Sequence, residues 1–308
     1  MTDAHELGTG WRPDEASERD YTPKKGKVAE LMAPTGIPDA MEMNAPLPSH
    51  VDLEKYCGPV KWQGRFSTCT AHVAVAMMEL LENRAHGHFV EGSRLFLYKV
   101  VKNLLGETGD VSVFLRQTLG TLALVGLPPE KYWPYLNPGP FKAPNGVDPR
   151  IDDEPTAFCY AIARNYRSLV SYRLDEVGTP ATDEVLHRAK AHLAAGFPVS
   201  LGIRLFASLK QSMNSGEIPL PLAENDAHTA NHAVTIIGYD DTRVITNTLP
   251  GGRTSTGAFK IQNSWSTKWG QKGFGWVPYE YVKEDGVSGD MWTLTRAEWI
   301  ATGSFGLD

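Results

Sequence analysis

A cysteine at the start of a predicted helix is the residue of this chain best suited to nucleophilic chemistry. In the stretch PVKWQGRFSTCTAHVAVAMME, Cys69 follows Gln63 by six residues and opens an apolar run at helical spacing. A thiol becomes a strong nucleophile only as the thiolate, and the partial positive charge of a helix N-terminus lowers its pKa. Cys69 is therefore the candidate nucleophile. Cys57 and Cys159 lack such surroundings, so we interpret them as structural.

A thiolate nucleophile also needs a base and a polar group that orients the base. His232 at the start of one predicted strand and Asn263 at the end of another supply these two types. Each residue alone is more simply a core or turn residue, and it is the ordered set that favours chemistry. His86 and His88 form a pair typical of metal ligands, but no cysteine or carboxylate cluster accompanies them, so we expect no metal and no organic cofactor.

Three motifs carry a family resemblance. PVKWQGRFSTCTAH, NHAVTIIGYDD and NSWSTKWGQKGFGW resemble the cysteine, histidine and asparagine motifs of papain-like (C1) cysteine peptidases, in the family's order. GWRPDEASERDYTP, LPSHVDLEKYCGPV and SRLFLYKV are similar to segments of its bacterial branch, which has little prodomain. The resemblance runs from about Gly10 to about Trp292. It implies hydrolysis of peptide bonds in a peptide or protein substrate through a thioester acyl-enzyme.

The resemblance also implies a role for each matched residue. Cys69 matches the nucleophile, and His232 matches the base that later protonates the leaving amine. Asn263 matches the residue that orients the imidazole, and Trp265 the indole that shields their hydrogen bond. Gln63 matches the glutamine that forms the oxyanion hole with the Cys69 backbone N–H, where donors face the developing negative charge.

Four residues are expected to contact substrate by the same resemblance. Asn231 and Trp265 flank the catalytic histidine and asparagine. Gly202 and Ala230 match the walls of the pocket that receives the second side chain before the cleaved bond. Both are small and apolar, so this pocket is predicted to prefer Leu, Phe or Tyr over charged side chains, because burying an unpaired charge is costly.

The chain departs from the family pattern in four places. Phe66 replaces a cysteine that forms a disulfide in secreted members, and Thr70 replaces the tryptophan after the nucleophile. Cys69 and His232 are 163 positions apart, more than the roughly 130–150 usual for papain-type enzymes. The interval from His232 to Asn263 is also long, and we predict a longer surface hairpin there.

Composition limits the other functional classes. The chain has 308 residues, 42% of them hydrophobic, and a formal charge of −6 without a basic block. Neither a nucleic-acid partner nor an anionic membrane is therefore expected. The first residues lack the apolar region of a signal peptide, and no apolar run reaches about 18 residues. With only three cysteines, these features favour a cytoplasmic protein.

The pattern of the chain predicts an α+β fold of two lobes with the active-site cleft between them. Residues 1–48 are predicted to form an extended arm on the surface that is not an obligatory cleaved propeptide. Residues 49–170 are predicted as a helical lobe with the nucleophile, and residues 171–308 as a β-barrel-like lobe with the histidine and asparagine. Helices are expected at 67–87, 93–105, 113–126 and 182–196, and strands at 198–206, 232–241, 257–265 and 273–282.

Two other functions remain open at this stage. The same acyl-enzyme can be resolved by an amine, which would make the protein an amidase or acyl transferase acting on a small amide. A non-catalytic binding protein on a peptidase scaffold is the second, although a scaffold needs none of the four matched catalytic residues. The sequence leaves open the physiological substrate, the choice between endopeptidase and exopeptidase, and the oligomeric state.

Overall fold

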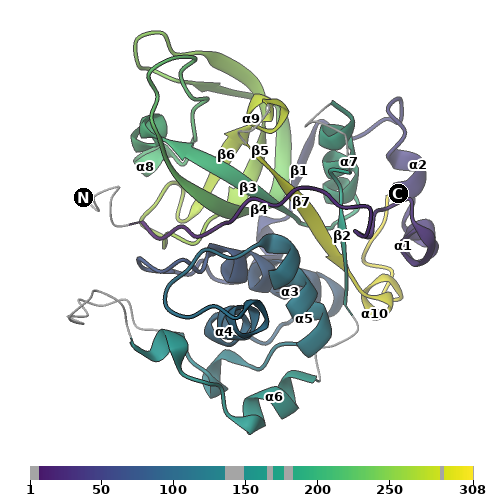
Figure 1. The fold of residues 1–308 in the computed structure, drawn as a ribbon. Helices are drawn as coiled ribbons and strands as arrows, with labels where there is room; N and C mark the ends of the chain where they lie inside the picture. The colour runs from purple at the N-terminus through teal and green to yellow at the C-terminus, as the bar shows by residue number, and fades with distance from the viewer. Residues whose placement is uncertain (1–6, 136–148, 165–168, 177–182, 285–287, 308) are drawn as a thin grey trace.

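The computed structural model describes residues 7–135, 149–164, 169–176, 183–284 and 288–307. Helices gather on one side of the molecule and an antiparallel sheet on the other (Figure 1), which is the predicted α+β arrangement of two lobes. The helical lobe contains α3 (Cys69–His86), α4 (Arg94–Leu105), α5 (Leu115–Val125) and α6 (Ala157–Ala163).

Helix α3 is the central helix of the protein. Its first thirteen residues are almost entirely buried, because α4 and α5 pack on one side of it and strand β4 (His228–Thr246) on the other. A helix that is apolar on all sides is stable only in such a buried place. The helix ends at Gly87, which has a φ of 73° and donates its N–H to the Asn83 carbonyl. This confirms the predicted helix start and stop.

The sheet runs in the order β2-β7-β3-β4-β5-β6, and all its pairs are antiparallel. Beside β4, its strands are β2 (Val170–Arg173), β3 (Val199–Phe206), β5 (Thr254–Gln262), β6 (Phe274–Pro278) and β7 (Ser288–Thr295). Strand β4 continues past the predicted end, and its pairing with β5 reaches Thr246 and Thr254. The predicted long hairpin between the histidine and the asparagine is therefore present.

The structure corrects two assignments. Tyr279–Lys283 form a short helix, α9, where the sequence predicted a strand, because Pro278 ends β6 and the chain turns toward β5. The short strand β1 (His50–Asp52) lies within the predicted helical lobe but pairs with β4 in the sheet. Helix α7 (Asp183–Ala194) packs on the sheet, and α10 (Ala297–Ile300) packs on α3.

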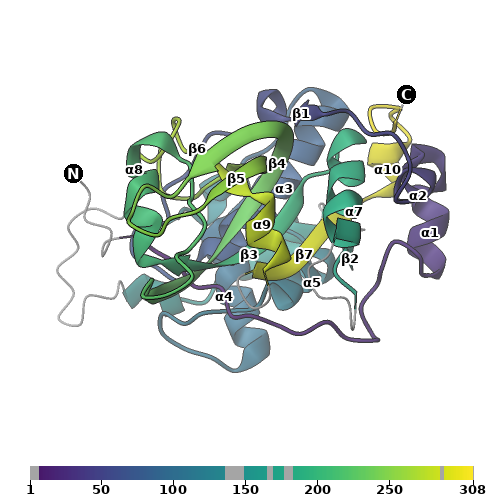
Figure 2. The ribbon, with the colours of Figure 1, turned by 90° about the horizontal axis from the view of Figure 1, so that it is seen from above.

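The N-terminal residues are not a simple surface arm. They begin as an extended segment and continue through the short helices α1 (Gly26–Met32) and α2 (Ile37–Ala40), the second of which packs on α7. In Figure 1 the extended segment crosses the molecule between α3–α5 and the sheet. Seen from above, α1 and α2 lie at the edge near α7 and α10 (Figure 2). Trp11 in this segment is only 4% exposed, so the predicted surface location is wrong for it.

Within the described ranges, no helix combines the length and the apolar character needed to cross a membrane.

Candidate active site

Cys69 is the first residue of α3, as the sequence predicted. Its side chain is fully buried. Burial raises the pKa of the thiol to about 12, while the backbone N–H groups of Ala233, Thr70 and Cys69 itself act in the opposite direction. The Ala233 N–H belongs to the residue after His232, so strand β4 brings the predicted base to the end of α3 where the thiol lies.

His232, Asn263 and Trp265 form one stack on the sheet side of the site. Nε2 of His232 donates a hydrogen bond to Asn263 Oδ1 at 2.8 Å. The indole of Trp265 stacks on the imidazole with ring centroids 4.4 Å apart and planes at 20°. Nδ1 of His232 has no hydrogen-bond partner among the described residues. With Nε2 held by the amide, Nδ1 is the ring nitrogen that remains without a described partner.

Gln63 is also fully buried, and its amide is fixed at both ends. Ser264 donates its hydroxyl proton to Oε1, and Nε2 donates to the carbonyl oxygens of Phe66 at 2.7 Å and Thr9 at 3.0 Å. The glutamine amide thus donates to two backbone carbonyls, one from the N-terminal segment and one from the loop that precedes Cys69.

Comparison with protein families decides the family of this site. The model of the papain family of cysteine proteases matches residues 47–292, which include the cysteine, histidine and asparagine motifs but not GWRPDEASERDYTP at residues 10–23. The chain belongs to the papain family of cysteine proteases. As a member, it is a hydrolase of the cysteine peptidase class, and its family acts on peptide or protein substrates.

Individual relatives agree with this assignment. Xylellain, a cysteine protease from Xylella fastidiosa, has a similar structure with a TM-score of 0.73 and 28% sequence identity, over 96% of this chain and 98% of that chain. A peptidase C1-like protein of Acanthamoeba polyphaga mimivirus is 25% identical over 75% of this chain and 68% of its own. Cathepsin K of Gallus gallus is 27% identical over 78% of this chain and 62% of its own.

Residues 7–14, called the covering segment below, lie directly on the site of this papain-family chain. Besides the Thr9 carbonyl held by Gln63, the Gly8 carbonyl accepts a hydrogen bond from the Trp265 indole at 2.7 Å. The Gly10 N–H donates to the Asn231 carbonyl at 3.1 Å. Three of the predicted site residues are thus already bonded to the chain's own backbone.

Two glycines permit this close approach. A Cβ at Gly8 would lie 2.6 Å from the Gly64 carbonyl oxygen, and one at Gly10 would lie 2.4 Å from the Ser67 carbonyl. Gly10 also has a φ of 121°, which side chains of L-residues rarely adopt. The motif GTGW at residues 8–11 is therefore built to lie against the backbone next to the nucleophile.

Burial disfavours the charged forms of both the cysteine and the histidine. His232 is fully buried, and burial lowers its pKa to about 4, against a smaller opposite effect of the Asn263 hydrogen bond. The pKa of the Cys69 thiol is shifted the other way, as described above. A thiolate and an imidazolium are both disfavoured by burial away from water, so the ion pair needs a more open site.

The predicted substrate residues do not share one pocket. Gly202 on β3 lies under the Trp11 ring, and a Cβ there would be 2.2 Å from Trp11 Cε2. Ala230 lines a separate cavity of about 330 Å³ together with Leu205 and Leu209. Leu7 of the covering segment closes part of this second cavity. Asn231 contributes its backbone carbonyl, as noted, and its side-chain Oδ1 accepts a hydrogen bond from His228 Nε2 at 2.9 Å.

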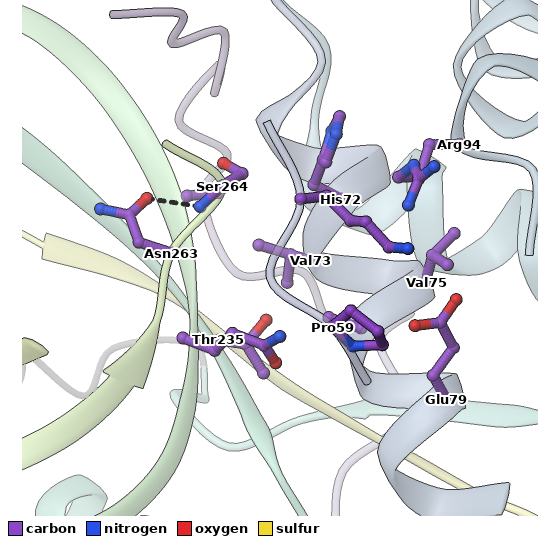
Figure 3. A pocket seen from close by; sticks show the side chains of 13 residues that line it. Pro59, His72, Val73, Val75, Glu79, Arg94, Thr235, Asn263 and Ser264 are labelled. Carbon is purple, nitrogen blue, oxygen red and sulfur yellow. Dashed lines mark hydrogen bonds between the residues drawn. The ribbon is translucent and has the colours of Figure 1, made fainter. Parts of the chain in front are cut away.

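A small cavity lies between α3 and the sheet, and Asn263 is part of its lining. Figure 3 shows Asn263 and Ser264 on the sheet side of it and His72, Val73 and Glu79 of α3 on the other. Its volume of about 20 Å³ is enough for a water molecule. His72 Nδ1 is hydrogen bonded to the Thr68 carbonyl at 3.0 Å, which ties this cavity to the turn before the nucleophile.

Sequence reasoning missed three residues of the site. Ser264 fixes the Gln63 amide, Tyr135 donates its hydroxyl proton to the Gln63 carbonyl at 3.0 Å, and Asp290 on β7 binds the Trp11 indole at 2.8 Å. Ser264 could have been predicted from the sequence, because it directly follows the predicted site residue Asn263. Tyr135 and Asp290 are far from the motifs in sequence, and only the fold brings them to the site.

Proposed function

We propose that this protein hydrolyses peptide bonds through a thioester on Cys69. His232 removes the thiol proton through Nδ1 and returns it to the leaving amine, while Asn263 keeps the imidazole in the required tautomer. Gln63 Nε2 and the Cys69 backbone N–H stabilise the oxyanion of the tetrahedral intermediate. The observation that carries this proposal is that the Gln63 amide Nε2 already donates to a peptide carbonyl, that of Thr9, at 3.0 Å.

The covering segment occupies the place of a substrate but runs in the opposite direction. The leaving amine of a substrate must face His232 and its neighbour Trp265, whereas the acyl part faces Gly202 by the family resemblance. The covering segment passes Trp265 at Gly8 and reaches Gly202 only at Trp11. Its peptide bonds are therefore presented in reverse to the thiol. We propose that it inhibits the enzyme without being a good substrate.

The proposal is tested by labelling with an epoxide that alkylates thiols, followed by mass spectrometry to locate the adduct. The expected adduct is on Cys69, because it alone lies beside a base and an oxyanion site. Burial raises the pKa of Cys57 far above its usual range, so Cys57 should react slowly. A peptide substrate in the same assay should be cleaved, and addition of free amines should show whether water is the preferred acceptor. A failure to label Cys69 in any variant would contradict the proposal.

Trp11→Ala is expected to raise kcat/KM for peptides and the rate of Cys69 alkylation by roughly tenfold or more. The indole is 4% exposed, and replacing a buried Trp with Ala typically costs about 3–5 kcal/mol. In this protein that cost destabilises the conformation in which the covering segment lies on the site. Tyr21→Ala is the matched control, since this side chain of the same N-terminal region is 58% exposed. Equal rates in the wild type and Trp11→Ala would show that the covering segment does not limit access.

A further inference from the structure

The side chain of Trp11 occupies a slot that would receive a substrate side chain. The main chain on either side of it pairs with one residue at the edge of the helical lobe. The Gly10 carbonyl accepts from the Val113 N–H at 3.0 Å, and the Arg12 N–H donates to the Val113 carbonyl at 3.0 Å. The Trp11 ring then lies on Gly202, the residue matched to the pocket wall.

A carboxylate lies at the far end of this slot. Asp290 is 1% exposed, and its Oδ2 accepts hydrogen bonds from Trp11 Nε1 at 2.8 Å and from the Asp14 N–H at 3.1 Å. Both donors belong to the covering segment. The other oxygen, Oδ1, is held by the protein body, where it is 3.0 Å from Arg173 Nη1 and 3.4 Å from Trp292 Nε1.

Removal of the covering segment leaves Asp290 Oδ2 without either of these donors. A buried acceptor that loses its partners costs about 1–3 kcal/mol, and more if it is charged. The charged groups around Asp290 also sum to a negative charge, because Arg173 faces two carboxylates, Asp290 and Asp175. The slot beside Gly202 therefore combines a flat apolar wall with a net negative end.

We propose that Asp290 is the residue that determines specificity in this slot, and that it selects substrates with arginine at the second position before the cleaved bond. This inference rests on the proposed function. The guanidinium is planar and can lie on Gly202 as the indole does, and its N–H groups replace the two donors that Oδ2 loses. It revises the apolar preference predicted from Gly202 and Ala230, since those two residues do not reveal the carboxylate.

The first test compares two peptides that differ only at this position, one with arginine and one with citrulline, on the wild-type enzyme. Citrulline has nearly the same shape and lacks the charge. The expected kcat/KM is at least roughly tenfold higher for arginine, as for one charge-assisted hydrogen bond in a desolvated site. A ratio near one overturns the inference. This comparison needs no variant, so it remains decisive if substitutions of buried Asp290 impair folding.

The second test measures the same ratio in Asp290→Asn and in Trp11→Ala. The covering segment competes equally with both peptides, so its displacement changes both kcat/KM values and leaves their ratio unchanged. We therefore expect the wild-type ratio in Trp11→Ala and a ratio near one in Asp290→Asn. An unchanged ratio in folded Asp290→Asn overturns the inference while leaving the proposed peptidase intact. Absence of cleavage of either peptide, by the wild type and by Trp11→Ala, overturns the proposed function itself.

Discussion

Cys69→Ala is expected to abolish peptide hydrolysis, with a fall in kcat of up to roughly 10⁶-fold, as found when the nucleophile of a comparable catalytic unit is removed. No other thiol is expected to replace it, because the Cys57 and Cys159 thiols donate to the backbone carbonyls of Leu53 and Tyr132 instead. The measurement is turnover of a fluorogenic peptide by enzyme that also carries Trp11→Ala, so that the covering segment does not mask the loss.

Cys57→Ser and Cys159→Ser are the controls for this prediction. Cys57 is partly buried and Cys159 is buried, and none of the three cysteines is in a disulfide. Both control variants should retain most of the turnover if their unfolding transitions resemble that of the wild type. Residual turnover in Cys69→Ala comparable to the parent, or loss confined to Cys57→Ser, would remove Cys69 from the mechanism.

Gln63→Ala is expected to lower kcat by roughly 10²–10³, the usual effect of losing one oxyanion-hole donor, with little change in KM. The substitution also removes the Gln63 hydrogen bond to Thr9, which helps to hold the covering segment. The comparison should therefore be made between Trp11→Ala and the double variant, where this second effect is small. An unchanged kcat in that background would contradict the role of Gln63.

Ser264→Ala gives a graded control for the same site. It leaves the Gln63 amide in place but removes the hydroxyl that holds Oε1. Because the glutamine still donates to Phe66 and can still reach the oxyanion, we expect a smaller fall in kcat than in Gln63→Ala. A larger fall would mean that Ser264 has a direct function of its own.

The core of the site was predictable because it depends on local signals. Helix start and stop residues place Cys69, and Asn263 directly follows the end of β5 as predicted, whereas His232 lies within β4 and not at its predicted start. The observed hydrogen bond between the last two, and the stacked Trp265, agree with the arrangement expected from the motifs. The substitution of Cys69 tests its role as the nucleophile, and the catalytic roles of His232 and Asn263 remain proposals.

The covering segment and Asp290 were not predictable in the same way. The residues GTGW show no hydrophobic period, so the sequence predicts a surface arm there, although two glycines around a threonine allow close backbone contact. Asp290 lies on a strand that the sequence analysis did not identify. Its importance arises from pairing of β7 with β3, where Gly289 lies opposite Gly202. Such long-range pairing leaves no mark in a single sequence.

The prediction of a strand through residue 282 failed for a physical reason. Tyr279, Tyr281 and Val282 have side chains typical of strands, and all three are buried. Pro278, which precedes them, has an extended backbone, and residues 279–283 then form a short helix. The hydroxyl of Tyr281 in this helix donates to the Arg204 carbonyl. Tertiary packing thus overrides local propensity here.

Attachment of the covering segment to the enzyme has a consequence for how activity responds to concentration. A tethered competitor has an effective concentration set by its linker, commonly in the millimolar range, and this does not change when the protein is diluted. Here the linker is further shortened by α1 and α2, which are anchored to the body through α7 and the contact of Leu307 N–H with the Thr35 carbonyl.

Dilution should therefore leave the fraction of covered sites constant, whereas a single cut between residue 14 and α1 would release the competitor to the bulk solution. The same eight residues added as a free peptide would then inhibit only weakly.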